Sequence, residues 1–303
     1  MRGAETTESI PAPPREISAA GRWSDFSQLV KTRLTALVLV TTGVGYYMAT
    51  RGPLDFVGLF HVLCGSALAA AGASALNQWW ERDLDALMLR TQTRPLPAGR
   101  MRPRSALILG SFLAAAGIIY LVLTTTALAA ILTAITVFVY LLGYTPMKRL
   151  SSSNTLVGAI PGAIPPLIGW AAVRGSIDFG AWTLFIILFF WQMPHFFAIA
   201  WLCRQDYDRA GFRMLSRDDA NGGRSASQAV LFCILLLLLA GIPAFINMVH
   251  PLYLVAEILL GSVFTMLAMR FHRETSVGNA RRLFIGSLVY LPLLLAALML
   301  SKQ

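Results

Sequence analysis

The chain has 303 residues, of which 56% are hydrophobic and only 13% are charged, and its net charge is +10. Soluble domains carry roughly 25% charged residues, so this composition excludes an ordinary soluble globular protein. The positive charge alone would permit a nucleic-acid partner, and its placement along the chain therefore has to be considered.

The first 26 residues contain three prolines and no hydrophobic run, which predicts a disordered cytoplasmic tail. Residues 27–303 predict a single transmembrane domain. Nine segments approach the roughly 20 apolar residues that cross a hydrocarbon core about 30 Å thick. We predict an all-α integral membrane protein with nine helices in one bundle around a central cavity. The spans lie near residues 34–50, 56–76, 105–126, 127–144, 155–173, 180–201, 228–248, 252–269 and 283–300.

The positive charges follow the predicted spans. If the amino terminus is cytoplasmic, only Arg51, Arg174 and Lys302 of the 25 Lys and Arg residues fall outside. This asymmetry is the positive-inside pattern. It predicts a multi-pass protein of the cell (inner) membrane, with the polar loops cytoplasmic and the carboxyl terminus outside. Topology thus explains the basicity, the lipid bilayer becomes the expected partner, and nucleic acid is excluded.

A row of oxygen-bearing side chains follows the second span. Asn77, Glu81 and Asp85 are spaced four apart, so on a helix they share one face. Carboxylate oxygens of this kind can hold Mg²⁺ together with substrate phosphate oxygens. Arg90 and Arg94, also four apart, add planar donors suited to phosphate. The segment predicts a diphosphate site, and the alternative is a solvated helix end with local ion pairs.

Two later segments carry further candidates. Span four ends with Tyr144, Lys148 and Arg149, whose cations either anchor the helix at the headgroups or cap the diphosphate site. Span six contains His195 and is followed by Asp206, eleven positions on, which an unbroken helix would return to nearly the same face. His195 has three candidate roles, as an iron or other metal ligand, a proton-transfer group, or a hydrogen-bonded structural residue.

These segments resemble the UbiA superfamily of intramembrane prenyltransferases, and more narrowly its haem branch, the protohaem IX farnesyltransferases. The resemblance covers roughly residues 30–300. It rests on Asn77-x3-Glu81-x3-Asp85, Arg90-Thr91-x2-Arg94-Pro95-Leu96, Tyr144-Thr145-x2-Lys148-Arg149, Pro165-Pro166-Leu167-Ile168-Gly169-Trp170, Trp191-Gln192-x-Pro194-His195-Phe196 and Asp206-Tyr207. One departure is that relatives commonly carry two carboxylates four apart in the last motif, whereas here Asp206 is followed by Asp208 and then Ala210.

The resemblance implies roles for these residues. It implies catalytic Mg²⁺ ligands at Asn77, Glu81, Asp85 and Asp206, with His195 as the residue that contacts the acceptor. Arg90, Arg94, Lys148 and Arg149 would stabilise the departing diphosphate, and Tyr144 and Tyr207 would help to bind substrate.

The resemblance also implies the reaction. A farnesyl group would pass from farnesyl diphosphate to a vinyl group of haem B, and water would add to give haem O. A downstream haem-modifying enzyme is a further partner that it allows. Two alternatives stay open from the residues alone. The first is prenylation of an aromatic ring such as hydroxybenzoate, and the second is a transporter, since carboxylates in membranes also mark ion paths.

Overall fold

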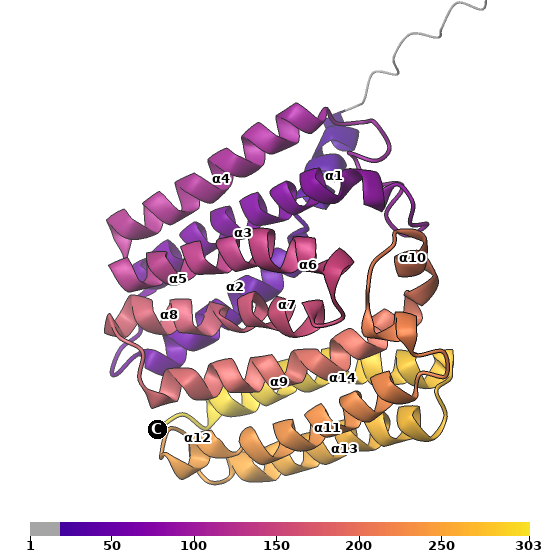
Figure 1. Cartoon of the computed structure of the whole chain (residues 1–303). Helices are drawn as coiled ribbons and strands as arrows, with labels where there is room; N and C mark the ends of the chain where they lie inside the picture. Colours follow the sequence, from indigo (N-terminus) through magenta and orange to yellow (C-terminus); the bar gives the residue numbers. More distant parts are fainter. Residues whose placement is uncertain (1–18) are drawn as a thin grey trace, which may run out of the picture.

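The computed structural model describes residues 19–303, and over this range the chain is helical throughout, with no β-strand (Figure 1). The helices are α1 (Ala19–Leu29), α2 (Thr32–Ala49), α3 (Phe56–Asp85), α4 (Pro103–Thr124), α5 (Ala127–Phe138), the π-helix η1 (Val139–Tyr144), α6 (Thr145–Leu150), α7 (Asn154–Ala163), α8 (Pro165–Arg174), α9 (Phe179–Leu202), α10 (Arg204–Arg209), the 3₁₀-helix η2 (Leu215–Asp218), α11 (Gly223–Leu239), α12 (Ile242–Phe245), α13 (Tyr253–Arg273) and α14 (Val277–Leu300).

Eight helical stretches of the described chain are long and apolar enough to cross a membrane. Three of them combine shorter helices, in the ranges Ala127–Leu150, Asn154–Arg174 and Gly223–Phe245. Helix α2, with 18 residues, is not among the eight, and it packs in the bundle against α3 and α8. Each of the nine predicted spans therefore has a helix. The all-α membrane fold is confirmed, with eight spans by this measure instead of nine.

Many large apolar side chains on the outside of the bundle are exposed, among them Phe112, Leu123, Phe138 and Leu238. In water such a surface would be unfavourable, whereas in a bilayer it meets lipid tails. The polar side chains Asn77, Gln78, Glu81 and Asp85 of α3 are, in contrast, buried within the protein. The structure therefore has the inside-out polarity expected of a membrane bundle.

The break predicted between spans three and four is confirmed. Helix α4 ends at Thr124, and α5 begins at Ala127 with Thr126 as its amino-terminal cap. The Thr126 hydroxyl accepts a hydrogen bond from the backbone amide of Ala129 at 3.2 Å. Threonine is one of the residues that close a helix start in this way, and the turn therefore needs no charged residue.

The predicted tail is wrong for its last part. Residues 19–26 belong to helix α1, and Asp25 in this helix is buried and paired with Arg100 at 2.8 Å. The Gln78 amide also donates to the backbone carbonyls of Gln28 and Leu29 at 2.8 and 2.7 Å. These partners are distant in sequence, so no local pattern indicates that α1 is held. Residues 1–18 of the predicted tail lie outside the described residues.

Helix α3 is longer than predicted. It continues for 30 residues, from Phe56 to Asp85, and does not end near residue 76. Gly72 of α3 and Gly117 of α4 face the backbone of the partner helix so closely that a Cβ on either would collide with it. Small residues permit this close packing in membrane helices. The packing positions the whole of α3, including the acidic residues of its last turns.

Candidate active site

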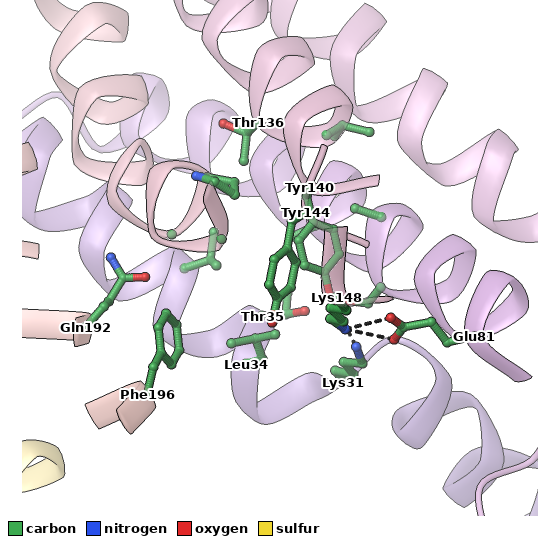
Figure 2. Close-up of a pocket in the computed structure, with 18 of the residues that line it drawn as sticks. Lys31, Leu34, Thr35, Glu81, Thr136, Tyr140, Tyr144, Lys148, Gln192 and Phe196 are labelled. Atoms are coloured by element: carbon green, nitrogen blue, oxygen red, sulfur yellow. Dashed lines mark hydrogen bonds and ion pairs between the residues drawn. The ribbon is translucent and has the colours of Figure 1, made fainter. Parts of the chain in front are cut away.

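A cavity of about 360 Å³ lies among α2, α3, α5, η1, α7 and α9. Along α3 it extends from Asp85 back to Ser66, a stretch of roughly 28 Å at 1.5 Å per residue. One end is polar and ionic, and part of it is shown in Figure 2. Most of the remaining wall is formed by small and apolar side chains, including Val38, Ala69, Ala70, Ala73, Ile168 and Phe196.

The predicted row on α3 is present. Asn77, Glu81 and Asp85 lie on one helix and retain 1%, 4% and 1% of their accessible surface. Glu81 and Asp85 line the cavity, whereas Asn77 lies beside it. A solvated helix end would leave these groups in water, so that alternative is wrong.

Each member of the row has a basic partner from another segment. Lys148 Nζ lies 2.7 and 2.9 Å from the two carboxylate oxygens of Glu81. Arg94 Nη1 lies 2.7 Å from Asp85 Oδ2. The third partner, Lys31, donates to Asn77 Oδ1 at 2.7 Å. Buried side-chain oxygens of α3 are therefore paired with cations from other segments at the polar end of the cavity.

Lys31 is a site residue that the sequence analysis missed. It precedes α2 and has a left-handed backbone with a φ of 49°, which is unfavourable for a residue other than glycine. Burial, together with the positive charges of nearby Arg94 and Lys148, lowers the pKa of its ammonium group to about 7. The only signal in the sequence was a lone lysine directly before the first predicted span.

The π-helix η1 brings two aromatic rings to the cavity. Short π-helical segments are often found at functional sites, because they shift the helix register locally. The rings of Tyr140 and Tyr144 stack with centroids 5.8 Å apart, and Lys148 Nζ lies 4.7 Å from the Tyr144 ring (Figure 2). Tyr144 and Lys148 both line the cavity, and their roles in binding substrate stay a prediction.

The loop after α3 places two arginines at the ionic end. Arg90 and Arg94 both line the cavity. Asp206, from α10, holds this loop, because its carboxylate accepts hydrogen bonds from the backbone amides of Leu89 at 3.1 Å and Arg90 at 3.3 Å. Asp206 also pairs with Arg209 and does not line the cavity. Its role as a metal ligand stays a prediction.

Tyr207 follows Asp206 and lines the cavity, where burial raises the pKa of its phenol to about 12. It is therefore a neutral hydroxyl beside the cations of the site. Arg149, in contrast, is exposed and does not line the cavity. Of the two adjacent cations, only Lys148 points inward.

His195 does not share a face with Asp206. The expected unbroken helix ends at Leu202, and Asp206 belongs to the separate helix α10. His195 Nδ1 lies 2.7 Å from the Ser287 hydroxyl of α14, which donates its own proton to the Phe284 carbonyl at 2.6 Å. The imidazole must therefore donate from Nδ1, which leaves the lone pair on Nε2.

The comparisons with known proteins identify the family. The model of the UbiA prenyltransferase family matches residues 38–296. The chain belongs to the UbiA prenyltransferase family. This UbiA-family chain is 42% identical over 287 residues to the protoheme IX farnesyltransferase of Solibacter usitatus, covering 92% of the chain and 98% of that relative. It is 36% identical to the human mitochondrial protoheme IX farnesyltransferase over 91% of the chain and 62% of that relative.

Solved structures support the UbiA fold. A digeranylgeranylglyceryl phosphate synthase superposes with a TM-score of 0.78 at 15% identity, over 92% of this chain and 98% of that one. A UbiA homologue from Archaeoglobus fulgidus, bound to GPP and Mg²⁺, superposes with a TM-score of 0.68 at 13% identity, over 90% of this chain and 99% of that one. At these identities the likeness concerns the fold.

The donor set of the cavity fits Mg²⁺. Among residues 19–303, no group of three or more His, Cys, Asp and Glu side chains forms a ready-made metal cluster. Mg²⁺ is commonly bound by one or two carboxylates together with substrate phosphates, and does not require a complete protein cage. The buried oxygens of Glu81 and Asp85, which both face the cavity, supply that number of carboxylates.

Proposed function

We propose that this chain transfers a farnesyl group from farnesyl diphosphate to a vinyl group of haem B, releasing diphosphate and forming haem O. The observation that carries the proposal is a single cavity with a buried ionic end and a long apolar wall. Such a cavity suits an amphiphilic diphosphate ester. The choice of haem as the acceptor rests on the protoheme IX farnesyltransferases that are 36 to 42% identical over most of the chain.

The ionic end would hold the diphosphate. Glu81 and Asp85 would be the primary Mg²⁺ ligands, with Asn77 and Asp206 as the further candidates. The bound metal would supply Lewis-acid stabilisation of the leaving group. Arg90, Arg94 and Lys148 line the same end and would hold the diphosphate oxygens through charged hydrogen bonds.

Lys31 would become available to bind the farnesyl diphosphate. Its ammonium group now occupies the Asn77 oxygen at 2.7 Å and lies 3.3 Å from the Tyr140 hydroxyl. A metal on the same oxygen would repel this cation, whose nearest alternative partner is the incoming diphosphate. Lys31 would thereby add a further positive charge to the leaving group.

The apolar wall would protect the allylic cation. Departure of diphosphate leaves a cation that water captures unless the cavity is dry. Small residues of α3, including Ala69, Ala70 and Ala73, leave room for the isoprenoid chain. The stacked rings of Tyr140 and Tyr144 line the same cavity beside Lys148, where their faces can stabilise positive charge.

The acceptor step forms one carbon–carbon bond. The vinyl alkene of haem B attacks the allylic carbon, and the positive charge moves to the carbon next to the porphyrin ring. Water then adds there and loses a proton, which gives the hydroxyethylfarnesyl group. His195 does not itself line this cavity, and its ring stacks on Trp191 and Phe284. It is our candidate for contacting the haem because its Nε2 carries a lone pair.

Spectra of bound haem separate the roles of His195. If it ligates iron, His195→Ala should change the absorption spectrum of haem bound to the purified protein and abolish prenylation. An unchanged spectrum with a 10²- to 10⁴-fold loss of turnover would indicate a proton-transfer group. An unchanged spectrum and rate would leave only the structural contact with Ser287.

The orientation in the membrane is also part of the proposal. We place the ionic end of the cavity in the cytoplasm, because most Lys and Arg residues are predicted on that side, whereas Arg174 and Lys302 lie at the opposite end of α2. A reporter fused after Lys302 should be external, and one inserted near Arg94 internal. An external Arg94 loop would overturn the orientation.

The proposed function is tested with purified protein, farnesyl diphosphate, Mg²⁺ and either haem B or hydroxybenzoate. We expect a product with the mass of haem O, formed only with haem B and lost on chelation. Prenylated hydroxybenzoate without any haem product would move the chain to the aromatic-ring branch of the family. A transport function would predict no prenylated product with either acceptor.

A further inference from the structure

Arg149 is exposed next to Lys148, a residue of the cavity wall, and its guanidinium has no partner in the described part of the chain. It follows Lys148 in α6, and the two side chains diverge, since Lys148 lines the cavity and Arg149 is exposed. Within residues 19–303, the Arg149 guanidinium forms no ion pair and no side-chain hydrogen bond. Arg149 does not line the ionic end of the cavity, so binding of the diphosphate does not explain its position.

Arg213 has the same relation to the cavity. It lies between Phe212 and Met214, which are both buried and both line the cavity, whereas Arg213 is exposed. In an extended segment alternate side chains point to opposite sides. Arg213 therefore points outward from a strip of chain whose neighbours form the cavity wall, and it too forms no ion pair in the described part of the chain.

The two arginines belong to segments that are tied together. The backbone amide of Arg213 donates to the Lys148 carbonyl at 2.6 Å, and the Asn154 amide donates to the Arg213 carbonyl at 2.9 Å. Arg213 Nη1 also lies 3.4 Å from the Leu150 carbonyl. The guanidinium of Arg213 is thus directed toward the end of α6 that carries Arg149.

We propose that Arg149 and Arg213 bind the two propionate groups of the porphyrin acceptor. This proposal rests on the proposed function. A porphyrin of this class carries its vinyl groups and its carboxylates on different edges. When the vinyl edge enters the cavity beside Phe212 and Met214, the propionates stay outside with Arg149 and Arg213, where water and guanidinium groups solvate their charge.

Arginine suits this task. Its planar group binds a carboxylate through two parallel hydrogen bonds, and two such groups on neighbouring segments fix the orientation of a rigid ring. Inner arginines usually anchor membrane helices to lipid headgroups. Arg281 is an exposed residue in the first turns of α14 and does not line the cavity. It is therefore a matched control for an arginine that only faces headgroups.

The test compares haem B with its dimethyl ester, in which both propionates are neutral, using the full chain in detergent. The wild type should have a KM for haem B roughly tenfold or more below its KM for the ester. The double variant Arg149→Gln with Arg213→Gln should raise the KM for haem B by about tenfold. Its kcat with the ester, its KM for the ester and its KM for farnesyl diphosphate should be unchanged, which also shows that it folds. Arg281→Gln should behave as the wild type.

Equal KM values of the wild type for haem B and for the ester would overturn the proposal that Arg149 and Arg213 bind the propionates. A raised KM for farnesyl diphosphate in the double variant would also overturn it and assign the arginines to the donor. An equal effect of Arg281→Gln would attribute the change to general surface charge or lipid headgroups. A wild-type chain that prenylates no porphyrin at all would instead refute the proposed function.

Discussion

Helix α3 carries an aspartate near each end, and the two are held in opposite ways. Asp55, which precedes the helix, accepts hydrogen bonds from the backbone amides of Val57 and Gly58 at 3.0 and 3.1 Å. Asp85 closes the other end and is paired with the Arg94 guanidinium. A helix start stabilises negative charge, whereas a helix end disfavours it. Asp55 is thus satisfied locally, and Asp85 depends on cations brought from elsewhere.

The same contrast extends to the cations at the two ends of the bundle. Opposite the site, Arg174 Nε donates to the Ala49 carbonyl at 2.7 Å, and Lys302 Nζ donates to the Thr50 carbonyl at 2.7 Å. These contacts close the end of α2 and involve no carboxylate. At the site, Lys148 and Arg94 face carboxylates that line a cavity. Carboxylates placed against the helix dipole and next to an open cavity indicate a function other than closing a helix.

The largest effect is expected from removing the charge of the site carboxylates. Glu81→Gln and Asp85→Asn should each lower turnover by at least about 10²-fold, because they remove the ligands of the metal that stabilises the leaving group. Turnover is measured as haem O formed per minute. The control, Asp55→Asn, replaces one good helix cap with another and should leave turnover unchanged. Near-normal turnover in Asp85→Asn would contradict the claim that Asp85, unlike Asp55, takes part in the reaction.

Lys148→Met should unfold the protein more readily as well as inactivate it. The substitution leaves Glu81 buried without its cation, which costs about 3–5 kcal/mol in the free energy of unfolding. Adding Glu81→Gln should recover much of this stability but none of the activity. Thermal unfolding in detergent and turnover check the two parts. Recovery of activity in the double variant would show that the pair is only structural.

A smaller effect is expected at Lys31. Lys31→Ala and Lys31→Gly both remove the ammonium group, and both should raise the KM for farnesyl diphosphate by about tenfold. Only glycine relieves the left-handed backbone, so the Gly variant should be more stable than the Ala variant by about 1 kcal/mol. Equal stability would show that the backbone at this position relaxes, and an unchanged KM would place Lys31 outside donor binding.

The sequence was sufficient for the features that depend on local periodicity. The spacing of Asn77, Glu81 and Asp85 predicted their common face, which follows from the geometry of one helix. The predicted spans 105–126 and 127–144 also placed the break where α5 begins. The excess of apolar residues likewise predicted the membrane bundle.

Features that depend on partners distant in sequence could not be predicted. Two adjacent cations, Lys148 and Arg149, look alike in sequence, and only the register of η1 and α6 decides which one faces Glu81. His195 was misplaced relative to Asp206, because no sequence signal showed that α9 ends at Leu202. Lys31 was missed because a lysine before a span also fits a simple membrane anchor.

The most direct test of the account is the Mg²⁺-dependent binding of an unreactive farnesyl diphosphate analogue, measured by calorimetry on the wild type, Asp85→Asn and Asp55→Asn. We predict that the wild type and Asp55→Asn bind the analogue with Mg²⁺ and lose most of the affinity on chelation. Asp85→Asn should bind weakly whether or not Mg²⁺ is present. Tight, Mg²⁺-dependent binding by Asp85→Asn would contradict the assignment of the carboxyl end of α3 as the donor site.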